Sequence, residues 1–134
     1  MARLVLDAWS LVSLFRNEPA APRVRAILEG GPSGEHQLYL TVVNLGEVSY
    51  TIERQQGLIG ASAALHRIDA YGVRIFDIDR PFALEAAKLK ATWRLGYADS
   101  FAAALAQRLG AAVVTGDRGF QRVEGIVPIE WLIQ

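Results

Sequence analysis

The chain alternates short apolar segments, typical of strands, with longer segments of helical periodicity. Consecutive strands that are joined through helices run in the same direction, because the helix carries the chain back along the sheet. The pattern therefore predicts an α/β fold, in which a mainly parallel sheet of about five strands has helices on both faces. We expect strands at residues 3–7, 36–41, 73–78, 111–115 and 125–129, and helices at residues 8–17, 19–31, 43–56, 60–72, 81–94 and 98–110.

The composition is that of one folded unit. A chain of 134 residues is long enough to bury a core, and its hydrophobic content of 51% excludes general disorder. The sequence has no internal repeat and no linker, so we expect residues 1–134 to form a single domain. Its apolar runs fall short of the ~20 residues that a membrane span needs. Asp7 interrupts the apolar N-terminal stretch, which we therefore assign to the fold and not to a signal peptide.

The charged residues and the cysteine content exclude several classes of site. The chain has no cysteine, which excludes disulfides, thiolate metal sites and a cysteine nucleophile, and which fits a cytoplasmic protein. Its 14 basic and 14 acidic residues cancel, so binding of a polyanion would have to be local. Twelve of the basic residues are Arg, which binds phosphate well, although a biased coding composition gives the same excess.

Four acidic residues map to one edge of the predicted sheet. Asp7 ends the first strand, and Asp117 lies just beyond the fourth. Glu47 lies one turn into the helix that follows the second strand, and Asp99 lies in the first turn of the helix that precedes the fourth. Ligands bind at the carboxyl ends of parallel strands, and all four positions fall at that edge.

Each of these acids also has a purely structural explanation. Asp7, Asp99 and Asp117 suit helix caps or helix N-termini, and Glu47 suits the border of a packed helix face. Clustered carboxylates would, however, repel each other by about 3 kcal/mol for a pair ~5 Å apart at an effective dielectric of ~20. A divalent cation is the natural counter-charge, and ligands that are all oxygen select Mg²⁺ or Mn²⁺ over Zn²⁺. The residues alone leave both interpretations open.

Other residues with chemical potential are interpreted as structural. The sequence has no Gly-x-Ser-x-Gly elbow, no Walker loop and no dinucleotide fingerprint. Both histidines, His36 and His66, are expected at the surface, and Asp79 is expected to cap a helix while Asp77 is peripheral. The tryptophans are expected to pack rather than to stack on bases; they are Trp9, Trp93 and Trp131.

Taken in order, the acidic segments resemble the PIN-domain ribonucleases. The resemblance rests on the strand that ends in Asp7, on "NLGEV" with Glu47, on "YADSFAAALAQRLG" with Asp99 and on "VVTGDRGF" with Asp117. It covers essentially the whole chain. The short single-domain form is similar to the toxins of VapBC-type toxin–antitoxin pairs, which implies an enzyme that inhibits translation and growth.

The resemblance implies a metal-dependent site for RNA hydrolysis that leaves a 3′-hydroxyl and a 5′-phosphate. The implied ligands of one or two Mg²⁺ or Mn²⁺ ions are Asp7, Glu47, Asp99 and Asp117. Thr115 matches the hydroxyl that the family carries two residues before its last Asp, and is implied to position a water or a metal. Asn44, three residues before Glu47, is implied to support the site or to serve the first turn of its helix.

Two positions depart from the pattern of the family. Trp9 stands where the family often has a small polar residue two positions after the first Asp, with Ser10 next to it. Gly119 stands where many relatives carry another acid. These departures affect the expected number of metal ions and the expected water network, whereas the four main acids are all present.

The resemblance also implies partners. They are an RNA substrate, a second copy of the chain in a homodimer, and a cognate antitoxin that lays a short segment over the acidic site. We expect Arg94, Lys90 and Arg118 to contact phosphates, because they flank Asp99 and Asp117 in the sequence. The apolar segments 11–15 and 26–31 would either form the antitoxin groove or simply pack against the sheet.

Two alternative functions remain at this point. A phosphoacceptor signalling domain also gathers acids and a Thr at the edge of a parallel sheet and binds Mg²⁺. That design needs a phosphoacceptor Asp after the third strand, for which Asp77 or Asp79 would serve, and a Lys after the last strand. The only lysines, Lys88 and Lys90, lie in one helix. A catalytically inactive PIN-like binding module is the other alternative, and the intact acidic set argues against it.

Overall fold

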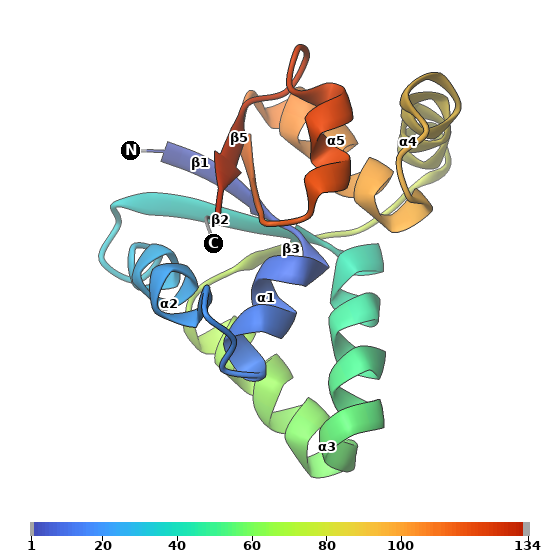
Figure 1. Cartoon of the computed structure of the whole chain (residues 1–134). Helices are drawn as coiled ribbons and strands as arrows, with labels where there is room; N and C mark the ends of the chain where they lie inside the picture. The colour runs from blue at the N-terminus through green and yellow to red at the C-terminus, as the bar shows by residue number, and fades with distance from the viewer. Residues whose placement is uncertain (1, 133–134) are drawn as a thin grey trace.

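The structure is a computed structural model that describes residues 2–132, and it contains a five-stranded parallel sheet. The strand order is β3-β2-β1-β4-β5, and every neighbouring pair is parallel (Figure 1). The strands are β1 (Ala2–Leu6), β2 (His36–Thr41), β3 (Arg74–Phe76), β4 (Ala112–Thr115) and β5 (Ile129–Trp131). The predicted fold class is confirmed.

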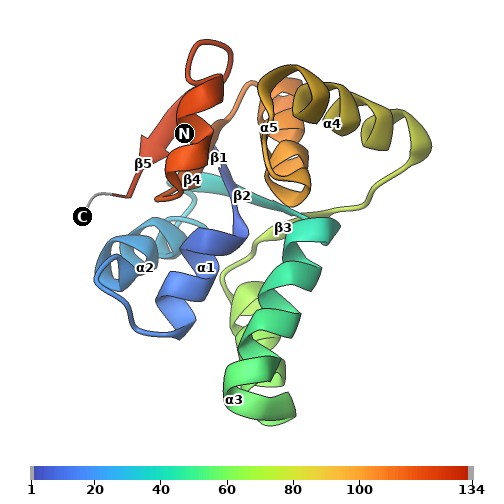
Figure 2. The same ribbon diagram turned by 45° about the vertical axis from the view of Figure 1, so that its right-hand side comes forward.

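Helices cover both faces of the sheet, as Figures 1 and 2 show. One face packs against α1 (Ala8–Phe15), α2 (Ala21–Glu29) and α3 (Val42–Ala70), and the other against α4 (Arg80–Trp93) and α5 (Tyr97–Leu109). A short 3-10 helix, η1 (Arg118–Val123), follows β4.

The central strands are apolar on both sides because each side is covered. In β1, Leu4 and Leu6 belong to the core layer beneath α1 and α2, whereas Val5 belongs to the layer beneath α5. In β4, Val114 belongs to the layer beneath α1 and α2, and Val113 belongs to the layer beneath α5. Successive side chains of a strand point to opposite faces, so a continuous apolar run identifies a strand that is buried on both sides.

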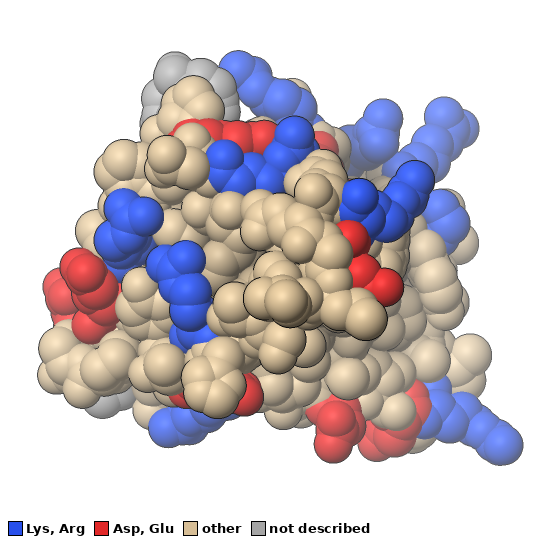
Figure 3. Space-filling view, turned by 90° about the horizontal axis from the view of Figure 1, so that it is seen from below, with Lys and Arg blue, Asp and Glu red and all other residues tan. Residues whose placement is uncertain are grey.

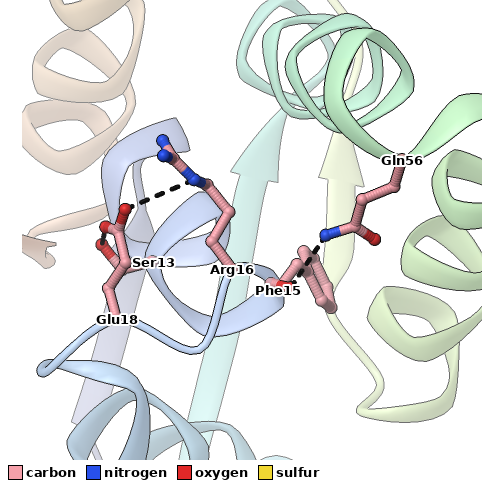
Figure 4. Close-up of polar contacts among 5 residues, drawn as sticks. All are labelled: Ser13, Phe15, Arg16, Glu18 and Gln56. Atoms are coloured by element: carbon pink, nitrogen blue, oxygen red, sulfur yellow. Dashed lines mark hydrogen bonds and ion pairs between the residues drawn. The ribbon is translucent and has the colours of Figure 1, made fainter.

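The α3 helix bends sharply at Gly57, which divides it into the two helices predicted at 43–56 and 60–72. Gly57 has φ 77° and ψ −179°, a conformation that only glycine adopts readily. Both arms are held to the end of α1. Gln56 Nε2 donates to the carbonyl oxygen of Phe15 at 3.2 Å (Figure 4). The Arg67 guanidinium lies 5.2 Å from the centre of the Phe15 ring.

The turn after α1 is fixed by its own polar contacts. Glu18 accepts a hydrogen bond from Ser13 Oγ at 3.2 Å and lies 3.3 Å from Arg16 Nε (Figure 4). The end of α1 falls at Phe15, two residues before the predicted end, and α2 is likewise shorter than the predicted range 19–31.

The last strand was predicted at 125–129, and that prediction is wrong in its bounds because β5 is Ile129–Trp131. The N–H groups of Ile126 and Val127 both donate to the carbonyl oxygen of Val123, so the chain is still turning there. Pro128 has no N–H to donate to a ladder. Pairing with β4 therefore begins at Ile129, opposite Val113.

Within residues 2–132, no helix is both long enough and apolar enough to cross a membrane.

Replacement of Gly57 by Ala should destabilise the protein by about 1–3 kcal/mol, since a side chain at this φ and ψ is strained. Gly46 is the matched control, because it lies inside the same helix with open space where a Cβ would stand. Gly46→Ala should leave stability unchanged or raise it by about 0.5–1 kcal/mol. Urea denaturation measures the free energy of unfolding of both variants. An equal change in the two variants would contradict the requirement for glycine at the bend.

Candidate active site

Asp7 lies at the carboxyl end of β1 and is buried, with 1% of its surface exposed. It is the N-cap of α1: its Oδ1 accepts from the N–H of Ser10 at 2.8 Å, and its backbone oxygen accepts from Ser10 Oγ at 2.8 Å. Its second carboxylate oxygen, Oδ2, accepts from the hydroxyl of Thr115 at the end of β4. The cap interpretation therefore accounts for one oxygen of Asp7, and the other joins two neighbouring strands.

Thr115 connects Asp7 to Asp117. The Thr115 side chain is fully buried, and its Oγ1 also accepts from the backbone N–H of Asp117 at 2.9 Å. Asp117 in turn caps η1, because its Oδ1 accepts from the N–H of Gly119 at 2.9 Å. The hydroxyl predicted to support the site thus fixes the turn that presents Asp117.

Glu47 is positioned by the first turn of α3. Thr41 caps this helix: its Oγ1 accepts from the N–H of Asn44 at 3.1 Å and donates to Asn44 Oδ1 at 2.6 Å. The buried Asn44 also donates through Nδ2 to the carbonyl oxygen of Ala98 at 3.1 Å. Because Ala98 precedes Asp99, this bond holds the helix of Glu47 against the helix of Asp99.

Asp99 lies in the first turn of α5 and is partly buried. The N-cap of that helix is Gly96, which has no side chain to cap it, and Asp99 itself makes no capping bond. A Cβ at position 96 would lie 3.2 Å from Asp99 Oδ2. The glycine therefore leaves the room that this carboxylate occupies.

The four carboxylates lie within electrostatic reach of one another. Burial raises the pKa of Asp7 to about 7, with the charge of Asp99 adding to the effect. Burial also raises the pKa of Asp99 to about 6, together with the charges of Asp117 and Glu47. The pKa of Glu47 is raised by burial and by Asp117, against the opposing influence of the Asn44 amide. The charge of Asp99 thus acts on Asp7, and the charges of Glu47 and Asp117 act on Asp99, so the four predicted acids lie at the same edge of the sheet.

The donor set fits a hard divalent cation. All the ligating atoms offered are oxygens, and Glu47 Oε1 is buried with no hydrogen-bond partner among the described residues. As the side chains stand, no three His, Cys, Asp or Glu residues within 2–132 are close enough together to hold one ion. The cluster therefore offers the oxygen ligands that such a cation prefers, but no group of three ready to hold it among these residues.

The basic residues near the acids are partly occupied by backbone contacts. Lys90, predicted to contact phosphate, donates from Nζ to the carbonyl oxygen of Leu95 at 2.9 Å. Arg94 has a left-handed backbone with φ 60° and an exposed side chain. Its carbonyl oxygen accepts from Arg122 Nη1 at 3.1 Å, so η1 is tied to the loop that leads into α5. Sequence reasoning missed Arg122, because no local pattern signals a contact 28 residues away.

Arg118 begins η1, directly after Asp117, and its side chain is exposed. It is therefore free to meet a ligand at this edge of the sheet.

Residues assigned to structural roles lie elsewhere. Asp79 caps α4, where its Oδ1 accepts from the N–H of Phe82 at 3.0 Å, as predicted, and Asp77 is exposed. His66 is exposed on α3. His36 was expected at the surface, but it is partly buried, with its ring against Gly30.

Residues 4–126 match the PIN domain, and the chain therefore belongs to the PIN-domain family. No protein with a curated description matches it in sequence.

Several solved structures share its fold. DNA-bound VapBC from Salmonella typhimurium is 22% identical with a TM-score of 0.76, covering 99% of this chain and 100% of that one. VapC20 from Mycobacterium tuberculosis, a toxin that cleaves the sarcin–ricin loop, is 15% identical with a TM-score of 0.76, over 94% of this chain and 98% of that one. FitAcB from Neisseria gonorrhoeae is 20% identical with a TM-score of 0.66, over 95% and 96% of the two chains.

The raised pKa values predict how stability depends on pH in the metal-free protein. The pKa values of Asp7 and Asp99 lie above the ordinary value of 3.8, so between about pH 4 and pH 7 the folded state binds more protons than the unfolded state. The free energy of unfolding, measured in urea with EDTA, should therefore fall as the pH rises through this range.

Asp99→Asn should raise the free energy of unfolding by about 1–2 kcal/mol at pH 8, because it removes a buried charge that faces like charges. Asp77→Asn is the control, an exposed carboxylate outside the cluster. A variant at Asp99 that is no more stable than wild type at pH 8 would contradict the electrostatic description.

Proposed function

We propose that this protein is a divalent-cation-dependent endoribonuclease that acts as the toxin of a toxin–antitoxin pair. The observation that carries the proposal is the set of four mutually repelling carboxylates at the carboxyl edge of the sheet, in which one buried oxygen of Glu47 has no partner among residues 2–132. Membership of the PIN-domain family supports it, as do the VapBC and VapC proteins of similar fold.

The residues that would hold one or two Mg²⁺ or Mn²⁺ ions are Asp7, Glu47, Asp99 and Asp117. When bound, such an ion supplies charge neutralisation at the scissile phosphate and lowers the pKa of water. The fixed hydrogen bonds of Asp7 to Ser10 and Thr115 would keep its carboxylate oriented. Asn44 would hold the helices of Glu47 and Asp99 together through the hydrogen bond that it donates to the carbonyl oxygen of Ala98.

The reaction would be hydrolysis of an RNA phosphodiester bond. A water oxygen attacks phosphorus, the bond from phosphorus to the 3′ oxygen breaks, and the proton from water passes to the leaving oxygen through the carboxylates or solvent. The products are a 3′-hydroxyl and a 5′-phosphate. The carboxylates and the ion that they would hold would share the removal of that proton, since the acids of the cluster are themselves the proposed ligands.

Substrate binding would depend on local cations. The face seen in Figure 3 carries basic side chains that are separated by acidic and uncharged ones, with no continuous basic surface. Arg94 lies in the loop that leads to the helix of Asp99, and Arg118 directly follows Asp117; both are exposed and would contact phosphates. The Lys90 ammonium, which would also contact phosphate, donates to the Leu95 carbonyl oxygen.

The proposed partners are an antitoxin and a second copy of the chain. DNA-bound VapBC from Salmonella typhimurium, VapBC2 from Rickettsia felis and a toxin–antitoxin complex from Klebsiella pneumoniae have a similar fold, which supports a cognate antitoxin for this chain. We also propose a cytoplasmic site of action, which the absence of cysteine fits. The apolar segments 11–15 and 26–31 are mostly packed against the sheet, which favours the structural interpretation of those residues.

The phosphoacceptor alternative is disfavoured by the lack of a Lys after the last strand. Of its two candidate phosphoacceptors, Asp79 uses its carboxylate to cap α4, whereas Asp77 is exposed. The match to the PIN domain over residues 4–126 also separates the chain from that class. A catalytically inactive binding module is the other alternative, and the activity assay below distinguishes it from a nuclease.

Purified protein, freed of any antitoxin, should cleave single-stranded or structured RNA with Mn²⁺ or Mg²⁺ and should be inactive with EDTA. Asp99→Asn should lower the cleavage rate at least about a hundredfold, because it removes a carboxylate that faces the cluster. Asp77→Asn should retain the wild-type rate. Absence of cleavage in every condition, together with an unchanged melting temperature in Mn²⁺, would favour a binding module.

Arg94→Ala and Arg118→Ala should each weaken RNA binding and lower the slope of log affinity against log salt by about 0.7, the value for one phosphate contact on a single strand. Binding is measured by fluorescence anisotropy in Ca²⁺ or EDTA at several salt concentrations. Arg54→Ala on α3 is the control. Unchanged slopes in both variants would remove these residues from the substrate site.

A further inference from the structure

Trp9 packs directly over Gly116. Trp9 lies in the first turn of α1, two residues after Asp7, and Gly116 separates Thr115 from Asp117. A Cβ at position 116 would lie 2.7 Å from Cζ2 of the Trp9 indole and closer still to Cη2 and Cζ3. Any side chain at position 116 would therefore overlap the indole.

The need for glycine at this position comes from space and not from backbone conformation. The glycines with positive φ are Gly34, Gly57, Gly72 and Gly110, and Gly116 is not among them. An alanine would be conformationally acceptable at position 116 if the indole were absent. Trp9 and Gly116 thus form a complementary pair, in which the ring occupies the volume that the missing side chain leaves.

The indole of Trp9 lies between this turn and the hydrophobic core. It is partly buried and packs against the hydrophobic cluster beneath α1 and α2. The turn on its other side is the segment that Thr115 ties to Asp7 and that ends in Asp117. Thr115 therefore fixes this turn through hydrogen bonds, and Trp9 fixes it through van der Waals contact.

We propose that Trp9 is a positioning residue that sets the place of the Asp117 carboxylate in the acidic cluster through its contact with Gly116. The inference rests on the proposed function, because the purpose of the placement is to hold a divalent cation. Ser10, the small polar neighbour of Trp9, is already engaged in capping α1 through Asp7. Ser10 therefore orients Asp7, whereas the indole of Trp9 contacts the turn that carries Asp117.

The contact itself is tested by a double-mutant cycle on the metal-free protein. Gly116→Ala should lower the melting temperature by several degrees in the wild-type background, since the new methyl group and the indole must separate. In the Trp9→Ala background the same substitution should change the melting temperature little. An equal loss in both backgrounds would overturn the proposal.

The positioning role is tested by Mn²⁺ titration, followed by the shift in melting temperature. Trp9→Ala should weaken Mn²⁺ binding roughly tenfold, because small displacements of a site residue have large effects. Trp9→Phe should recover part of the loss, and Trp93→Ala, which removes an exposed indole from α4, should bind as wild type does. A purely structural role for Trp9 would lower the melting temperature and leave the Mn²⁺ midpoint unchanged, which would overturn the proposal.

Gly116→Ala serves as the second variant if Trp9→Ala fails to fold, and it should also weaken Mn²⁺ binding. The outcomes separate this inference from the nuclease activity. If wild type binds Mn²⁺ but cleaves no RNA, and Trp9→Ala weakens binding, the inference stands and the proposed function fails. If wild type cleaves RNA and Trp9→Ala matches it in both binding and rate, the function stands and the inference fails. Failure of wild type to bind Mn²⁺ would overturn the inference.

Discussion

The hydrogen bond from the Thr115 hydroxyl to the buried carboxylate of Asp7 joins the two central strands at the edge where the acids gather. A buried carboxylate is costly unless its oxygens accept hydrogen bonds, and here Ser10 and Thr115 supply them. The same hydroxyl accepts from the N–H of Asp117, so one side chain fixes the position of two acids. The ends of β1 and β4 are thereby held together by hydrogen bonds of the chain itself.

Cationic side chains lie near this edge, yet two of them bind the backbone instead of the acids. Lys90 and Arg122 both donate to carbonyl oxygens of the loop between α4 and α5, which leads into the helix of Asp99. They therefore hold the elements that carry Asp99 and Asp117 without neutralising the carboxylates. An ion pair with one of the acids would have lowered its pKa, whereas the pKa values of Asp7 and Asp99 are raised. Among residues 2–132, no Lys or Arg forms an ion pair with the four acids.

The sequence allowed prediction of those features that follow from chain direction and periodicity. Parallel strands share a carboxyl edge, so the positions of Asp7 and Asp117 at that edge could be predicted from the strands alone. The bounds of β5 could not, because they depend on the Val123 carbonyl, which keeps the chain turning until Pro128. The contact of Trp9 with Gly116 was equally invisible, since it joins positions more than one hundred residues apart in the chain.

Helix capping explains part of the acidic set and fails for the rest. Asp7 and Asp117 cap α1 and η1, so each would be expected in a protein with no ligand at all. Glu47 and Asp99 make no cap, and both have pKa values that are raised by burial and, to a smaller extent, by neighbouring like charges. Natural chains retain such unfavourable placements where function requires them. Glu47 and Asp99, which capping does not explain, are therefore the stronger support for a cation at this edge. The capping hydrogen bonds of Asp7 and Asp117 fix the positions of the other two carboxylates of the site.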